Sequence, residues 1–202
     1  MLTLYHSPQS RSIRPRWLLE EIGAPYEVKL IRLEAGDQKS PEYLKLNPNG
    51  TVPTLVDGDL VLWESAAICQ YLADKFPERG LAPAVGTPER GAYYQWIHYA
   101  MSTLEPPAIT IFLHTVRLPE TDRVPQLVDA ARIQLAAAVT VVNDALAGRE
   151  WMLGSQFTAA DVMVGSTLWW AQLMGLIGEQ HPNAQAYLAR CMARPAMQRA
   201  NA

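Results

Sequence analysis

Hydroxyl groups stand at two predicted helix starts in the first third of the chain, where they suit the binding of an anion. Ser10 and Arg11 follow the strand-like segment 2–5 and open a helical pattern. Glu64 and Ser65 follow another strand-like segment and open a second one. A helix N-terminus offers unpaired N–H groups and the positive end of its dipole to an anion. The same residue types also serve as plain N-caps, so their position alone leaves both roles open.

No activated protein nucleophile is evident from the sequence. A serine attacks only when a base lies beside it, and none is apparent near Ser10. Cys69 and Cys191 each lie in an apolar helical pattern without CxxC or metal-ligand spacing, so we expect them to be structural. The histidines stand apart from one another without ligand spacing, at positions 6, 98, 114 and 181. We assign them no role and predict no metal.

Composition excludes several classes of protein. The chain has 202 residues, enough for one large or two small domains, and 49% of them are apolar. Lys and Arg number 17 against 20 Asp and Glu, with no basic cluster, which argues against nucleic-acid binding. No secretory leader pattern opens the sequence, and the most apolar run, 135–142, is too short to cross a bilayer. We expect a soluble, cytoplasmic protein with no membrane partner.

Strand and helix patterns alternate through the first part of the chain. The predicted order is β-α-β-α-β-β-α, where the opening β-α-β favours a parallel pair and Asp57-Gly58-Asp59 favours an antiparallel hairpin. The strands are predicted at 2–5, 26–31, 52–56 and 60–63, and the helices at 10–22, 40–46 and 65–76. The pattern describes a small mixed sheet covered by helices.

Only helical patterns follow the Pro- and Gly-rich segment 78–86, which we take as a linker between domain 1–77 and domain 87–202. The first of these helices starts at Thr87-Pro88 and is interrupted at Pro106-Pro107; others are predicted at 128–145, 158–176 and 183–192. Thr158 and Asp161 form a structural capping box. The fold class is therefore α/β plus all-α.

Four segments, in this order and spacing, resemble the cytosolic glutathione transferase family, and within it a microbial subgroup with Ser-Arg-Ser at the first helix. They are Tyr5–Ser12 leading into Trp17–Gly23, then Asn47–Leu55, Glu64–Ile68 and Phe157–Asp161. The resemblance spans the whole chain. It implies a thioredoxin-like N-terminal domain that binds glutathione, and an all-helical domain that completes the pocket for a second substrate.

The resemblance implies a cis peptide bond between Val52 and Pro53, where the sequence alone would allow a trans proline entering a strand. The cis bond would turn the main chain of Val52 toward the cysteinyl part of glutathione, as in strand addition. Thr51 and Arg11 are further implied glutathione contacts.

For the two ends of glutathione, the family assigns Ser65 to the γ-glutamyl carboxylate and Glu64 to its ammonium group. A basic residue is expected at the glycyl carboxylate. Lys39 is the nearest candidate, and Arg32 is the alternative.

Activation of the glutathione thiol requires a hydroxyl donor. A free thiol has a pKa near ~8.5, and lowering it by about two units needs about 2.7 kcal/mol of preference for the thiolate. Ser10 is our first choice, because its hydroxyl, the helix dipole and Arg11 converge there. Ser7 matches the serine-type position counted back from Arg11, and Tyr5 matches the tyrosine-type position, so both stay candidates.

The implied function is conjugation of glutathione, as co-substrate, to small electrophilic or apolar compounds, a detoxification activity of a homodimer. Alternatives are glutathione-dependent peroxide or disulfide reduction, and a catalytically silent ligand-binding module. Five aromatic residues either line the acceptor pocket or belong to the core, and helical spacing favours the core: Tyr93, Trp96, Tyr99, Trp169 and Trp170.

Overall fold

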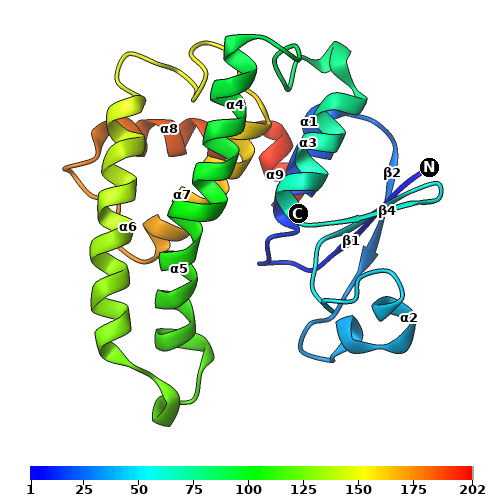
Figure 1. Ribbon diagram of the computed structural model, residues 1–202, viewed down its shortest axis with the longest axis horizontal. Helices are drawn as coiled ribbons and strands as arrows, with labels where there is room; N and C mark the ends of the chain where they lie inside the picture. Colours follow the sequence, from blue (N-terminus) through cyan, green and yellow to red (C-terminus); the bar gives the residue numbers. More distant parts are fainter. Residues whose placement is uncertain (202) are drawn as a thin grey trace. The chain divides into compact units, whose positions relative to one another are not determined.

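Two compact units make up the computed structural model, which describes residues 1–201 (Figure 1). One unit comprises Met1–Ala82 together with the chain from Ala193 onward, and the other comprises Pro83–Met192. The first contains a four-stranded sheet, and the second is helical. The predicted class, α/β plus all-α, is confirmed.

The sheet unit has the predicted order of elements. Its strands are β1 (Leu2–His6), β2 (Tyr26–Leu30), β3 (Thr54–Asp57) and β4 (Leu60–Trp63), in the spatial order β2-β1-β3-β4. Its first helices are α1 (Ile13–Ile22), α2 (Pro41–Leu44) and α3 (Ser65–Lys75), with 3-10 turns at Asp37–Lys39 and Pro77–Arg79. β1 runs parallel to β2 and antiparallel to β3, and β3 with β4 forms the predicted hairpin.

One end of this sheet collects the segments that were predicted to do chemistry. Tyr5 of β1 lies opposite Thr54 of β3, and Thr54 lies opposite Trp63 of β4. The end of β1, the segment before β3 and the start of α3 therefore meet at the same edge.

The two faces of β1 carry different environments, because side chains alternate along a strand. Leu2, Leu4 and His6 are buried on one face. Tyr5 points to the other face, where its ring meets the Tyr43 ring of α2 edge-on at 5.5 Å between centroids. In Figure 1, α1 and α3 lie side by side next to the sheet, and α2 lies across the strands from them.

The chain end differs from the predicted division, which placed 87–202 in the helical domain. Helix α9 (Pro195–Asn201), which was not predicted, packs against α1 in the sheet unit. Arg194 makes two bonds to the Glu21 carboxylate, at 2.5 and 2.8 Å, and Arg199 meets Glu20 at 2.7 Å. Two ion pairs and an apolar face thus hold the chain end to α1.

The helical unit contains α4 (Pro88–Tyr99), α5 (Glu105–Phe112), α6 (Pro125–Ala145), α7 (Ala159–Leu173) and α8 (Pro182–Ala193), with a 3-10 turn at Glu120–Asp122. At the predicted proline break, the π-helical turn Ala100–Leu104 joins α4 to α5. Pro106 and Pro107 lack the N–H groups that an α-helix needs at these positions, so the hydrogen bonding shifts there. A second π-turn, Leu113–Arg117, ends α5.

The capping box at Thr158 and Asp161 is confirmed, and Asp161 also accepts the N–H of Met152 at 2.8 Å. Tyr93 and Trp96 are buried in this unit, as the core interpretation predicted, while Tyr99 and both tryptophans at 169 and 170 are partly exposed. Among residues 1–201, no helix has the length and apolar character to cross a membrane.

We predict that the α9 contact carries a measurable share of the stability. Met197 is 1% exposed, so Met197→Ala should lower the free energy of unfolding by about 2–5 kcal/mol, by removing apolar contacts and leaving a cavity. Urea unfolding followed by circular dichroism measures this. The neighbouring Gln198 is exposed, and Gln198→Ala is the matched control. Equal stability of the two variants would contradict a packing role for α9.

Candidate active site

Three serine hydroxyls cluster in the turn that leads from β1 into α1. The Ser10 hydroxyl lies 2.7 Å from the Ser7 carbonyl oxygen and 2.7 Å from the Ser12 hydroxyl. It also accepts the N–H of Ser12 at 3.2 Å, so Ser10 satisfies one N–H group at the helix start. The helix itself begins at Ile13, later than predicted, because a tight turn through Ser10–Ser12 precedes it; Arg11, in that turn, is half-buried.

His6, to which the sequence assigned no role, lies against this cluster. Its Nδ1 is 2.7 Å from the Ser12 hydroxyl, and its Nε2 is 3.3 Å from Nη1 of Arg16. Burial, and secondarily the Arg16 charge, lowers the pKa of His6 to about 4, so the imidazole is neutral at pH 7. The alternation of side chains along β1 could have indicated where His6 lies, because it puts His6 on the same face as Leu2 and Leu4, toward α1.

The peptide bond between Val52 and Pro53 is cis, as the resemblance implied. Within residues 1–201, the main-chain N–H and C=O of Val52 make no hydrogen bond. The loop before it is held firmly, because the carbonyl oxygen of the exposed Thr51 accepts bonds from the Tyr43 hydroxyl at 2.7 Å and from Asn47 Nδ2 at 2.9 Å. A fixed loop thus presents an unpaired main-chain donor and acceptor beside the end of β1.

The start of α3 joins an unusual backbone to a buried cation. Glu64 has φ +75° and ψ 112°, a sparsely populated conformation for a residue with a side chain, and it is exposed. Ser65 is 3% exposed, and its hydroxyl accepts a bond of 3.2 Å from Nη1 of the equally buried Arg14 of α1. The sequence analysis did not identify Arg14. Its charge adds to the positive end of the α3 dipole.

The two candidates for the glycyl carboxylate have different surroundings. Lys39 donates to the Asn49 carbonyl oxygen at 3.2 Å, on the loop that leads to Val52. Glycine suits position 50, because φ there is +58° and a Cβ would lie 2.9 Å from the main-chain carbonyl oxygen of Gln38. Arg32 instead pairs with Asp37, with Nε at 2.9 Å and Nη2 at 3.2 Å from its two oxygens.

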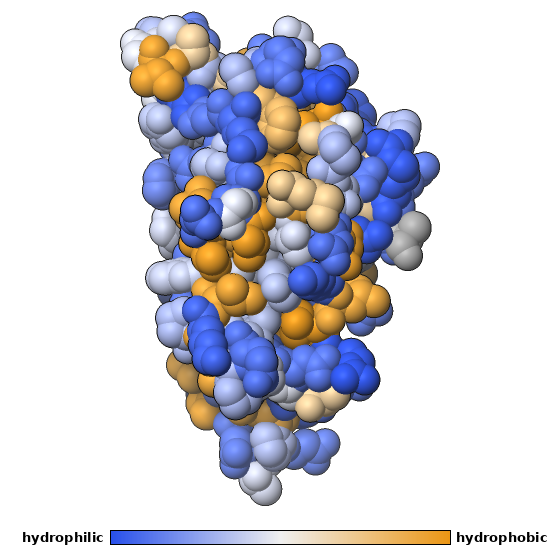
Figure 2. All heavy atoms as spheres, turned by 90° about the vertical axis from the view of Figure 1, so that its right-hand side faces the viewer, coloured by the Kyte–Doolittle hydropathy of each residue, from blue (hydrophilic) through white to orange (hydrophobic). Residues whose placement is uncertain are grey.

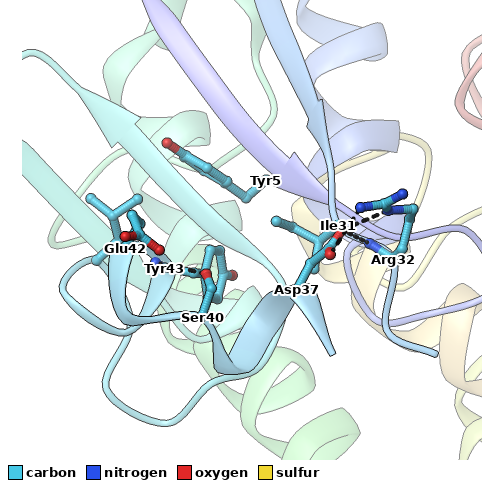
Figure 3. A pocket seen from close by; sticks show the side chains of 8 residues that line it. Tyr5, Ile31, Arg32, Asp37, Ser40, Glu42 and Tyr43 are labelled. Atoms are coloured by element: carbon cyan, nitrogen blue, oxygen red, sulfur yellow. Dashed lines mark hydrogen bonds and ion pairs between the residues drawn. The ribbon is translucent and has the colours of Figure 1, made fainter. Parts of the chain in front are cut away.

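Tyr5 lies apart from the serine cluster, on the α2 side of the sheet. It borders a hollow of about 310 Å³ that also includes Tyr43, Ile31 and the Arg32–Asp37 pair. Figure 3 shows the Tyr5 hydroxyl pointing away from that ion pair. The structure therefore brings Ser7 and Ser10 together near the start of α1 and does not bring the Tyr5 side chain to them.

Neither cysteine is placed to act as a nucleophile. Both are fully buried, and burial raises the pKa of the Cys69 thiol to about 12. A thiol of this kind stays protonated and shielded at neutral pH.

A mixed sheet, a cis-proline loop and a separate helical unit define a thioredoxin-like domain coupled to an all-helical one. Residues 1–74 match the family model for the glutathione S-transferase N-terminal domain, and residues 125–190 match that for the C-terminal domain. The chain belongs to the glutathione S-transferase family.

Individual relatives agree with this assignment. The glutathione S-transferase GstB of Escherichia coli K12 is 32% identical, over 98% of this chain and 97% of that protein. The theta class glutathione S-transferase of Xanthomonas axonopodis pv. citri, solved with glutathione bound, is 34% identical with a TM-score of 0.87, covering 98% and 96% of the two chains. The transferase URE2P6 of Phanerochaete chrysosporium, in complex with oxidized glutathione, is 28% identical with a TM-score of 0.88, covering 98% and 94%.

We predict that His6 makes folding sensitive to mild acid. Its pKa falls from 6.5 to about 4 on folding, so the unfolded chain binds more protons in this window. This contribution to stability is complete above pH 6.5 and is lost as the pH falls toward 4. Urea midpoints measured between pH 7 and pH 4.5 should therefore fall more steeply for the parent than for His6→Asn. The exposed His98 provides the control: His98→Asn should keep the parent's slope.

Proposed function

We propose that this chain conjugates the thiolate of glutathione to small electrophilic or apolar compounds, with Ser10 as the hydroxyl donor to the sulfur. The observation that carries the proposal is the meeting of three groups at one sheet edge: the Ser10 turn, the unpaired main chain of Val52 and the Ser65 helix start. Together they offer partners for a thiolate, for the peptide groups of the cysteinyl unit that carries it, and for the γ-glutamyl carboxylate, all of which glutathione has.

The γ-glutamyl end is assigned to the start of α3. The Ser65 hydroxyl and the helix N–H groups suit the carboxylate, and Arg14 beneath them strengthens the local positive field. The exposed Glu64 carboxylate suits the ammonium group. Val52 would pair with the cysteinyl unit as an added strand does, and Lys39 would meet the glycyl carboxylate.

The chemistry then needs little beyond a stable thiolate. The thiol loses its proton to solvent, the Ser10 O–H donates to the sulfur, and the dipole of α1 favours the negative charge. The sulfur attacks an electrophilic carbon; the new C–S bond forms as the leaving group departs with its electron pair. No protein thiol takes part, which agrees with the burial of Cys69 and Cys191.

The test of this function is the pKa of the thiol in bound glutathione, read from thiolate absorbance across pH. Ser10→Ala should raise it by about 1–2 units, because a hydrogen bond to a charged acceptor is worth about 1.5–3 kcal/mol. Conjugation to an aryl halide at pH 7 should fall by about tenfold or more, with a hydroperoxide and a mixed disulfide assayed alongside.

Thr121→Ala is the control, since that exposed hydroxyl donates to the Asp122 carboxylate and does not line the hollow proposed for the dimer interface. If Ser7→Ala or Tyr5→Phe raises the thiol pKa and Ser10→Ala leaves it unmoved, Ser10 is not the activator.

A second prediction separates Lys39 from Arg32. Lys39→Met should weaken glutathione binding by about threefold to tenfold, through loss of a charge-assisted contact. Arg32→Met should leave the affinity unchanged, because its guanidinium is already paired with Asp37. Calorimetry with γ-glutamylcysteine, which lacks the glycyl carboxylate, is the internal control: both variants should bind it as the parent does. An Arg32 effect confined to glutathione would reverse the assignment.

A homodimer is also proposed, with the segment after α4 at the interface. A hollow of about 470 Å³ lies between this segment and α6, lined by Tyr99, Pro106, Pro107 and Val141 among others. Val141 is 49% exposed, so this apolar side chain is available for contact with another molecule. In the sheet unit, Leu60 and Trp63 are exposed as well. Figure 2 shows apolar side chains among polar ones on the face of the molecule that it views. Such surfaces suit burial against a second copy.

Light scattering at micromolar concentration should therefore give twice the mass of the 22.4 kDa chain. Val141→Glu should shift the mass toward one chain, because a charge would then have to be buried without a partner. Leu173→Glu is the matched control, since Leu173 is 70% exposed on another helix of the same unit. A single-chain mass for the parent would exclude the dimer.

A further inference from the structure

Four side chains form a continuous hydrogen-bonded chain between the first turns of α1 and the Ser10 hydroxyl. Arg16 Nη1 lies 3.3 Å from His6 Nε2, and His6 Nδ1 lies 2.7 Å from the Ser12 hydroxyl. The Ser12 hydroxyl lies 2.7 Å from that of Ser10. His6 and Ser12 are 1% and 0% exposed, so water does not compete for these two groups.

Arg16 fixes the direction of the hydrogen bonds along these four side chains. A guanidinium donates and never accepts, so His6 Nε2 must be the acceptor. A neutral imidazole carries one N–H, which is therefore on Nδ1 and donates to the Ser12 hydroxyl. That hydroxyl also accepts the Ser7 N–H at 3.0 Å. With both lone pairs occupied, the Ser12 O–H is left to donate, to Ser10 or to the Ser7 carbonyl oxygen at 3.0 Å.

Of the two acceptors open to the Ser12 O–H, the Ser10 oxygen is the closer, at 2.7 Å against 3.0 Å, so Ser10 receives this donor and keeps its own proton available. Its hydroxyl oxygen faces the Ser12 N–H at 3.2 Å and the Ser12 O–H. Its own O–H points to the Ser7 carbonyl oxygen in this structure, and can turn from there to an anion at the helix start. The opposite direction, from Ser10 through Ser12 to His6 Nδ1, would set an N–H of His6 against an N–H of Arg16.

We propose that Arg16 and His6 are positioning residues that hold Ser10 as a hydrogen-bond donor to the glutathione thiolate, acting through Ser12. This inference rests on the proposed function, in which Ser10 contacts the sulfur. Arg16 supplies a fixed positive end to the chain, and each donated bond polarises the next, which strengthens the last bond by about 10–30% per step.

The test compares the pKa of the bound glutathione thiol in single and double variants. Arg16→Gln and His6→Asn should each raise it by about 0.3–0.6 unit, less than Ser10→Ala does. Arg16→Lys, which keeps a charged donor, should restore most of the effect. In a Ser10→Ala background, neither substitution should shift the pKa further, because the chain then has no hydroxyl through which to act. Arg199→Gln is the control, since it removes a nearby charge, bonded to Glu20, that does not contact His6.

The outcomes separate the two hypotheses. If Ser10→Ala leaves the thiol pKa unmoved, the proposed activator fails, and this inference fails with it. Two other results overturn only the proposed role of Arg16 and His6, and the proposed activator stands. In one, Ser10→Ala raises the thiol pKa while Arg16→Gln and His6→Asn leave it unmoved. In the other, the effects of Arg16→Gln and His6→Asn add to that of Ser10→Ala. Nitrogen NMR of the parent protein gives a reading that needs no variant to fold: His6 should carry its proton on Nδ1, and a proton on Nε2 would overturn the proposal.

Discussion

The register of β3 between β1 and β4 is the constraint on which the rest of the sheet unit depends. Thr54 lies opposite both Tyr5 and Trp63, and this pairing aligns the end of β1 with the segment before β3 and with the start of α3. A slip by one residue would turn Leu55, which is 1% exposed, from the core toward the other face. It would also carry Val52 and Ser65 away from the serine turn. Burial of the core and assembly of the site are thus one requirement.

Helix α1 contributes two arginines, Arg14 and Arg16, that contact residues of the candidate site. A buried guanidinium is costly unless its donors are used. Arg14 donates to the Ser65 hydroxyl, and Arg16 donates to the His6 ring. Both of these partners are neutral hydroxyl or imidazole groups. One helix therefore places a guanidinium next to each of two proposed sites, the one for the carboxylate and the one for the thiolate.

The sequence predicted the elements well because each has a local signal: alternation in the strands, the Asp-Gly turn in the hairpin and Thr-x-x-Asp at α7. Val52, Pro53 and Ser65 were named because their motifs are short and contiguous. His6 and Arg16 were missed because no local motif joins them. They meet only when β1 and α1 pack together, with the His6 side of β1 facing α1. Helix α9 was missed as a part of the sheet unit because Arg194 meets Glu21 across 173 positions of sequence. Tyr5 was grouped with Ser10 by counting residues, and alternation along β1 separates the two.

The backbone of Glu64 is strained next to the proposed ligand site. A residue with a side chain at φ +75° costs on the order of 1–3 kcal/mol, and glycine would adopt this conformation with little strain. Its side chain makes no cap bond to the helix that it opens, so capping does not account for it. The carboxylate itself is what glycine would lack, and an exposed carboxylate beside an anion-binding helix start suits a ligand that carries an ammonium next to its carboxylate. In the proposed function, recognition of the amino-acid end of the ligand accounts for the strain at Glu64.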